Sequence, residues 1–187
     1  ADLYIDRSEI PDKLVILTLK DNILIPTSGI DVSNANGYYI LWPQNPFECA
    51  KQIYQFIQKT YKLKKVGVII SDSRSNFLRL GVTGIGLAYY GFLPLKDYRG
   101  KKDIFGRELK LSQTNMVDSL AAAAVCTMGE GNEQTPLAII EDINNISFTD
   151  FDFTKDNSLS VDMKNDIYAP LFRSAPWKKG GSSNKKS

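Results

Sequence analysis

Three short acidic segments contain the residues whose types and spacing best suit chemistry. They are residues 28–34 (SGIDVSN), 71–73 (SDS) and 128–133 (MGEGNE), and each follows a predicted strand or helix. Such segments leave carboxylate, hydroxyl and backbone oxygens free to converge on a hard divalent cation. Taken singly, each is more often a turn or a helix cap, because an aspartate after a strand commonly has that role.

The chain contains no histidine. This excludes a Ser-His-Asp triad, a Cys-His dyad and an imidazole-ligated zinc within this chain. Any metal must therefore be held by oxygen ligands, which indicates magnesium or manganese. Cys49 and Cys126 lie in apolar helical patterns, so we expect two buried thiols, as in a reducing cytoplasm.

Charge and hydrophobicity bound the partners. The 187 residues carry a net charge of +2, and four lysines in the last ten residues leave the rest at about −2. A nucleic-acid-binding face is therefore not supported. No apolar run approaches the roughly 20 residues of a membrane span, and no signal peptide opens the chain. We expect a cytoplasmic protein that binds neither nucleic acid nor membrane.

Strand and helix patterns alternate, which predicts an α/β or mixed α+β fold. The first helix pattern begins with Asn45 as a possible cap and Pro46 at the first helical position. The second helix pattern ends at Gly129, a suitable residue for a helix C-terminus. The expected strands are two around a turn in 14–26, one in 38–43, one in 66–71, one in 80–93 and one in 136–140. One helix is expected to begin at residue 46, and a second is expected over about 114–128.

Two further segments have a structural and a functional interpretation. The glycines of GVTGIG, residues 81–86, match neither a P-loop nor the GxGxxG spacing, so close packing of a strand is the better interpretation. Residues 97–110 form a charged loop ending in a short strand, which is either solvated or holds an anion.

Taken in order, the motifs resemble the CofE-like gamma-glutamyl ligases, which add glutamate to a deazaflavin coenzyme precursor. The resemblance runs from about Ile23 to Ile140, two-thirds of the chain, and its wording is closest to a branch labelled as a folate-metabolism gamma-glutamate ligase. The segments that carry it are SGIDVSNANGYYILWP, VGVIISDS, LRLGVTGIG, PLKDYRGKKDIFGREL and VDSLAAAAVCTMGEGNEQTPLAII.

The resemblance implies a CofE-like fold of mixed sheets with packed helices, in an intertwined homodimer with the site near the subunit interface. Residues 1–150 would form the main part of the ligase domain and 151–177 a C-terminal extension packed on it, while the composition of 178–187 predicts a disordered tail. The family's N-terminal segment, with a Ser-Lys motif, has no counterpart before Ala1, and we expect it to be missing from this sequence. The chain alone is then expected to fold but to be nearly inactive.

The same resemblance implies roles for individual residues. Asp31, Asp72, Ser73 and Glu130 would hold magnesium or manganese. Asn34 would contact GTP or ATP, together with the loop from Gly129 to Pro136. That loop consists of Gly129, Glu130, Gly131, Asn132, Glu133, Gln134, Thr135 and Pro136.

The implied reaction joins L-glutamate to the terminal carboxylate of a folate-type or deazaflavin coenzyme acceptor. Nucleoside triphosphate hydrolysis drives it through an acyl phosphate, with catalytic roles for Asp31, Asp72 and Arg79. Cationic side chains must offset the charge that gathers between two anions. Besides Arg79, the candidates are Lys96, Arg99 and Lys102.

One departure from the family keeps other functions open. A Gly-Arg pair common in the family is replaced by Arg74-Ser75-Asn76. A non-catalytic binding or scaffold protein of the same fold is therefore the main alternative. A dinucleotide oxidoreductase is a weaker one, because only the glycines at 81–86 suggest it.

Overall fold

The computed structural model describes residues 1–11, 13–155 and 157–181. These residues divide into two compact units. The first contains Ala1–Trp42, Arg74–Gly81 and the described residues from Ser160 onward. The second contains Pro43–Ser73 and Val82–Leu159. Strands and helices are both present in each unit, which agrees with the expected mixed fold.

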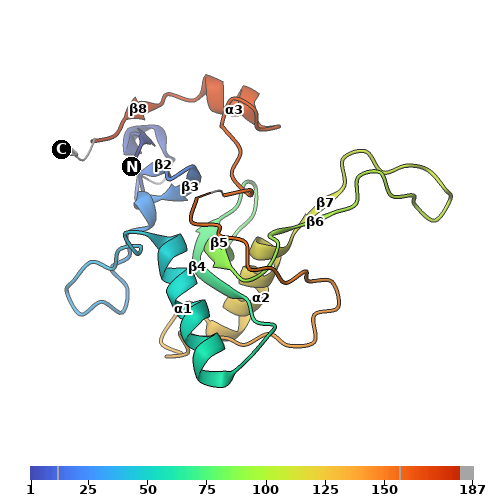
Figure 1. Ribbon diagram of the computed structural model, residues 1–187. Coiled ribbons are helices and arrows are strands. Elements are labelled where there is room, and N and C mark those ends of the chain that lie inside the picture. The colour runs from blue at the N-terminus through green and yellow to red at the C-terminus, as the bar shows by residue number, and fades with distance from the viewer. Residues whose placement is uncertain (12, 156, 182–187) are drawn as a thin grey trace. The chain divides into compact units, whose positions relative to one another are not determined.

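An antiparallel sheet organises the first unit (Figure 1). The hairpin predicted within residues 14–26 is confirmed, because Asp21 and Asn22 both adopt positive φ in a tight turn. Such turns match the twist of the flanking strands, and Asp and Asn tolerate this conformation. The sheet has the order β3-β2-β1-β8, formed by β1 (Leu3–Ile5), β2 (Leu17–Lys20), β3 (Ile23–Pro26) and β8 (Lys178–Lys179), with the short helices η1 (Arg7–Glu9), η2 (Thr27–Gly29) and α3 (Ala169–Ser174) beside them in the sequence.

The strand β8 corrects the expectation of a disordered tail over 178–187. Lys179 pairs with Leu3 of β1, and Gly180 N donates to the Asp2 carbonyl at 3.0 Å. Lys178 also forms an ion pair with Asp6 at 3.2 Å. Composition predicted disorder here, but the free edge of β1 supplies hydrogen-bond partners that the composition does not reveal. Residues 182–187 lie outside the described residues.

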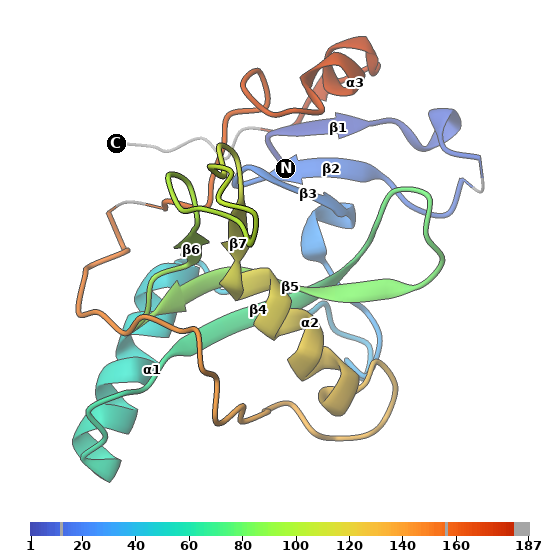
Figure 2. The same cartoon turned by 90° about the vertical axis from the view of Figure 1, so that its right-hand side faces the viewer.

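Two strands and two helices form the centre of the second unit (Figure 2). The strands β4 (Val68–Ser75) and β5 (Val82–Tyr90) pair with each other, and α1 (Pro46–Tyr61) and α2 (Met116–Met128) both lie against β5. The α1 side chains Ala50 and Tyr54 pack on Val68, Ala88 and Tyr90. A second cluster contains Tyr89, Phe92, Met116, Val117 and Phe153.

The glycines of β5 allow α2 to approach the strand backbone. A Cβ placed on Gly84 would lie 2.3 Å from the Ala121 carbonyl oxygen, and one on Gly86 would lie 2.1 Å from Val117 Cγ1. The amide of Gly86 donates to Asp118 Oδ1 at 2.9 Å, so the first turn of α2 is also hydrogen-bonded to the strand. The prediction of close packing is confirmed for Gly84 and Gly86, whose packing partner is a helix, and for Gly91, whereas a Cβ on Gly81 would have nothing within 4 Å.

The charged segment 97–110 belongs to a long hairpin. Its base is formed by β6 (Leu95–Asp97) and β7 (Gln113–Asn115), which pair antiparallel. Figure 1 shows the hairpin extending away from the two helices of its unit. Near its tip, the Asp103 carboxylate accepts the amides of Phe105 and Arg107, each at 2.8 Å.

Two expected strands are wrong. Residues 38–43 form only an isolated bridge between Ile40 and Asp31. Residues 136–140 form no strand, and Leu137 and Ile139 are 79% and 81% exposed. An apolar run becomes a strand only where a neighbour takes its backbone hydrogen bonds along its length. Residues 38–43 have such a ladder only at Ile40, and no described strand pairs with 136–140.

Three smaller expectations also need correction. Cys126 is exposed and Cys49 is half-buried. The packed face of α2 runs through Val117 and Ala121, and Cys126 lies off that face, because residues four apart share a helix side and those five apart do not. Asn45 occupies the N-cap of α1, but its side chain makes no capping hydrogen bond.

No helix in the described part of the chain is long and apolar enough to cross a membrane.

A methyl group on Gly84 should destabilise the second unit. We expect Gly84→Ala to lower the free energy of unfolding by about 1–3 kcal/mol, because the new Cβ meets backbone rather than a movable side chain. Urea denaturation followed by circular dichroism measures the change. Gly181→Ala is the control, because a Cβ there has nothing within 4 Å. Equal stability of the Gly84 variant and the wild type would contradict the close-packing argument.

Candidate functional site

The structure brings two of the three acidic segments together. Ser73 lies on β4, and Glu130 follows the C-terminus of α2. Ser73 Oγ donates to Glu130 Oε2 at 2.9 Å, although the two residues are 57 positions apart. Because α2 is packed on β5 and β5 pairs with β4, the end of the helix falls beside this strand. A hydroxyl and a carboxylate thus share one place, as an oxygen-ligand site requires.

Asp72 and Ser73 do not lie in a loop after a strand, as the sequence suggested. The strand β4 continues through both residues to Ser75. It is longer than its apolar run because it remains paired with β5, and pairing does not require apolar side chains. Both side chains are partly buried, and Ser73 N donates to Asp72 Oδ1 at 2.7 Å.

The loop Gly129–Pro136 folds back on the end of α2. Gly129 has a φ of 78°, which favours glycine, and its amide donates to the Val125 carbonyl at 2.8 Å. Gly131 N donates to Glu133 Oε2 at 2.8 Å. Thr135 Oγ1 donates to the Met128 carbonyl at 2.7 Å, which fixes the far side of the loop. These hydrogen bonds therefore fix the conformation of the loop at the C-terminus of α2.

The electrostatics of this loop favour a cation. The carbonyl end of a helix carries partial negative charge, and the last turn of α2 contains no basic residue. Glu130 and Glu133 add two carboxylates directly after it. Phosphate groups favour the opposite, amide end of a helix. The loop therefore suits a metal ion that in turn holds phosphate better than it suits phosphate alone.

Asp31 lies in the first unit, after an unusual turn. Thr27, Ser28 and Gly29 have φ of 53°, 58° and 67° in succession. Only a glycine fits at the last position, because a Cβ there would lie 2.1 Å from the Trp42 indole nitrogen. The chain then reaches Asp31, whose backbone bridges to Ile40.

Two hydrogen bonds from Ser33 hold the Asp31 carboxylate. The Ser33 amide donates at 2.8 Å to Oδ1, and its hydroxyl lies 2.7 Å from Oδ2. These bonds, that of the backbone amide first, lower the pKa of Asp31 below its ordinary value. Asp31 is exposed and is therefore a carboxylate throughout the neutral pH range. Asn34, three residues on, adopts a positive φ of 52°.

The proposed cationic residues differ in the contacts that they already make within the protein. Arg99 forms an ion pair with Asp97 at 2.5 Å, and Lys96 Nζ donates to Asn145 Oδ1. Lys102 lies in a backbone bridge with Glu108. Arg79 is exposed, in the segment between β4 and β5 that belongs to the first unit.

Sequence reasoning missed two residues that position this site. Asp118 joins the first turn of α2 to β5 and also accepts from Asn115 Nδ2 at 2.7 Å. The spacing Asn-x-x-Asp at the start of a helix is a capping pattern and was a usable signal. Thr135 bonds to the end of α2 from a loop without periodicity, and no sequence signal indicates that contact.

Asp31 belongs to one unit, and Asp72, Ser73 and Glu130 belong to the other. Within the described residues, no group of three or more acidic, cysteine or histidine side chains is placed to hold a metal. The convergence of Asp31 with Asp72 and Glu130 stays a prediction.

Comparison with known proteins assigns the class. Residues 5–142 match the family model described as F420-0:Gamma-glutamyl ligase. The matched region contains all three acidic segments and covers most of the chain. The chain belongs to this family.

Several curated relatives have the name coenzyme F420:L-glutamate ligase. The one from Methanocaldococcus jannaschii is 41% identical over 130 residues, 70% of this chain and 52% of the relative. A relative from Methanococcus maripaludis is 41% identical over 126 residues, 67% of this chain and 50% of the relative. One from Methanopyrus kandleri is 35% identical over 130 residues, 69% of this chain and 51% of the relative. The chain thus spans about half the length of the relatives it matches.

Removing the Ser33 hydroxyl should raise the pKa of Asp31. In Ser33→Ala, we expect the pKa to move up toward the ordinary aspartate value, because one of the two stabilising donors is lost. Since the folded-state pKa is lowered, any stability that this ionised group gives is present above the ordinary pKa and lost as the pH falls through the lowered one.

Carbon-detected NMR titration of the carboxyl groups measures this change. Asp6 is an internal reference, because the Ser8 amide and hydroxyl donate to it in the same manner and, together with Lys178, hold its pKa at about 2. The reference should not move in the variant. An unchanged Asp31 titration in Ser33→Ala would contradict the assignment.

Proposed function

We propose that this protein acts as a gamma-glutamyl ligase, which joins the amine of L-glutamate to a terminal carboxylate of an acceptor. The observation that carries the proposal is the hydrogen bond between Ser73 and Glu130, which unites two family motifs at the negative end of α2. Membership of the F420-0:Gamma-glutamyl ligase family supports the reaction class.

The acceptor we propose is a precursor of a deazaflavin coenzyme. The names of the curated relatives specify coenzyme F420 and L-glutamate, and they support this acceptor over a folate-type one.

The chemistry must first activate the acceptor carboxylate. In the proposed first step, a carboxylate oxygen attacks the γ-phosphorus of GTP or ATP. The bond to the bridging oxygen breaks, and a nucleoside diphosphate leaves. The resulting acyl phosphate is attacked by the glutamate amine, which forms the amide, releases phosphate and loses a proton. The first step gathers negative charge, so electrostatic stabilisation is the main task of the protein.

Magnesium or manganese suits the oxygen donors present at this place. Ser73, Asp72 and Glu130 would hold the ion, and Asp31 is proposed as a further ligand. A bound divalent ion would neutralise charge on the phosphate groups. The Gly129–Pro136 loop would then position the nucleotide beside the ion, with Asn34 as a further contact. Arg79 is the exposed candidate for stabilising the transferred phosphoryl group.

We also propose that the protein is a homodimer. Large apolar side chains are almost fully exposed at two places, Leu78 and Leu80 before β5 and Ile104 and Phe105 at the hairpin tip. Exposed apolar groups of this size commonly mark an interaction surface.

Glu130→Gln should weaken both metal binding and catalysis. Replacing one carboxylate oxygen by an amide nitrogen removes a ligand and a charge while it keeps the shape. We expect the affinity for Mn²⁺ to fall at least about tenfold, since losing even an outer partner of a metal ligand often costs that much. In a protein that also carries the family's N-terminal segment, glutamate-dependent phosphate release should fall about 10² to 10³ fold. Electron paramagnetic resonance measures free Mn²⁺, and a coupled assay measures phosphate.

The matched control is Glu141→Gln, which removes an exposed carboxylate of the same unit outside the loop. It should leave Mn²⁺ affinity and turnover unchanged. Equal behaviour of the two variants would refute the metal assignment. Absence of glutamate-dependent and acceptor-dependent phosphate release from the protein that carries the N-terminal segment would favour the non-catalytic scaffold alternative.

The oligomeric state has a separate test. Light scattering at micromolar concentration should give about twice the chain mass. Phe105→Asp should shift the distribution toward the monomer, because a charge at an apolar contact is costly to bury. A wild type that remains a monomer across the concentration range would overturn the dimer proposal.

A further inference from the structure

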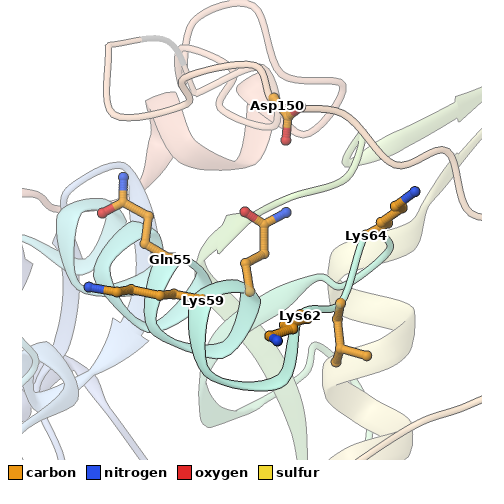
Figure 3. A pocket seen from close by; sticks show the side chains of 7 residues that line it. Gln55, Lys59, Lys62, Lys64 and Asp150 are labelled. Atoms are coloured by element: carbon orange, nitrogen blue, oxygen red, sulfur yellow. The ribbon is translucent and has the colours of Figure 1, made fainter.

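A basic hollow lies in the second unit, away from the acidic segments in the sequence. Its volume is about 740 Å³, and Gln55, Gln58, Lys59, Lys62, Leu63, Lys64 and Asp150 line it. Figure 3 shows the α1 side chains on one side of the hollow, Asp150 opposite them, and Lys64 beyond the helix end. Three lysines and two amide side chains thus line one open hollow.

The lysines of the hollow have no acidic partners. No ion pair to Lys59, Lys62 or Lys64 occurs among the described residues. The single carboxylate of the hollow, Asp150, accepts a hydrogen bond from the Tyr54 hydroxyl at 2.7 Å. The hollow therefore carries uncompensated positive charge.

The wall of the hollow is fixed by hydrogen bonds. Gln58 Nε2 donates to the Tyr54 oxygen at 2.7 Å, and Tyr54 in turn donates to Asp150. Lys51 pairs with Asp152 at 2.8 Å, and Phe153 next to it is buried. The segment bearing Asp150 is thereby held against α1, so the hollow does not depend on one mobile side chain.

Lysines near a helix C-terminus also stabilise the helix by themselves. That effect is confined to the last turn. It explains Lys59 and Lys62, but not Lys64 beyond the helix or the two glutamines further back. A binding role accounts for the whole lining.

The polar groups are distributed over the end of α1 and the segment after it. Gln55 and Lys59 are four residues apart on α1 and share one side of it, whereas Lys62 is the left-handed C-cap with a φ of 54°, and Lys64 follows it. Lysines are flexible point charges, whereas tight phosphate sites use planar arginines or the amide end of a helix. Neither of those is present in the lining. Flexible lysines and amides in this distribution best fit a flexible chain that carries several carboxylates.

We propose that this hollow binds the γ-glutamyl chain of the acceptor or product, a flexible polycarboxylate. The proposal rests on the ligase function proposed above and adds a second contact outside the reacting groups. Lys59, Lys62 and Lys64 would pair with successive carboxylates, and Gln55 and Gln58 would bind the amides between them.

The test is an NMR titration of the nitrogen-15-labelled protein with γ-linked tetraglutamate at low salt. The side-chain amide signals of Gln55 and Gln58 should shift. Lys59→Gln/Lys62→Gln should raise the dissociation constant about fivefold or more, since two surface ion pairs are lost. The control Lys110→Gln/Lys155→Gln removes the same charge from exposed positions of the same unit and should bind as the wild type does.

Tripolyphosphate, of similar charge, separates a carboxylate chain from any polyanion. It should bind at least about tenfold more weakly than the peptide at these signals. Equal binding of tripolyphosphate, equal weakening in the control variant or unmoved Gln55 and Gln58 signals would each overturn the proposal. The ligase reaction can be tested independently with an acceptor that carries one carboxylate. If the protein turns over this acceptor but does not bind the tetraglutamate peptide, the binding role of the hollow is refuted and the proposed ligase function is not.

Discussion

The close approach between α2 and β5 is the constraint on which the second unit depends. Gly84 and Gly86 have no side chains to hold the helix away, so α2 packs on β5 through its own residues Val117 and Ala121. The distance between a helix and a strand is set by the side chains between them, so two glycines bring the end of α2 to the level of β4. The contact between Ser73 and Glu130 is a result of that distance. A larger residue at Gly84 or Gly86 would push α2 away from β5 and would thereby displace the acidic loop after α2, although the sequence of that loop is unchanged.

Much of the fold was predictable because local patterns determined it. Helix α1 follows from its spacing and from Pro46 at its first turn, and the β2–β3 hairpin follows from Asp21 and Asn22. Where the sequence was misleading, the deciding factor was a partner distant in the chain. The apolar run around Ile139 lacks a neighbouring strand, whereas the polar Lys179 has one in β1. Strand formation depends on available hydrogen-bond partners, and a local pattern carries no information about them.

The candidate site likewise has features that the sequence predicted and features that it did not. The acidic segments were recognisable as units of sequence, and the family assignment placed them in one class. Their arrangement was not recognisable, because Ser73 reaches Glu130 across 57 positions through the packing of a helix. The state of Asp31 was equally hidden, since it depends on how Ser33 turns back on it. Residue types therefore indicated which chemistry is available, and tertiary packing decided which groups meet.

The bond from Gly86 to Asp118 has a consequence for solubility. An unpaired strand amide is a template on which another chain can add a strand, and proteins protect such edges against aggregation. Here the carboxylate of a packed helix occupies one amide of β5, in the middle of the strand. A foreign strand would have to displace the packed helix α2 to pair at this point. The hydrogen bond that orients α2 thus also hinders the addition of a strand from another molecule, so the sheet of β4 and β5 stays two-stranded.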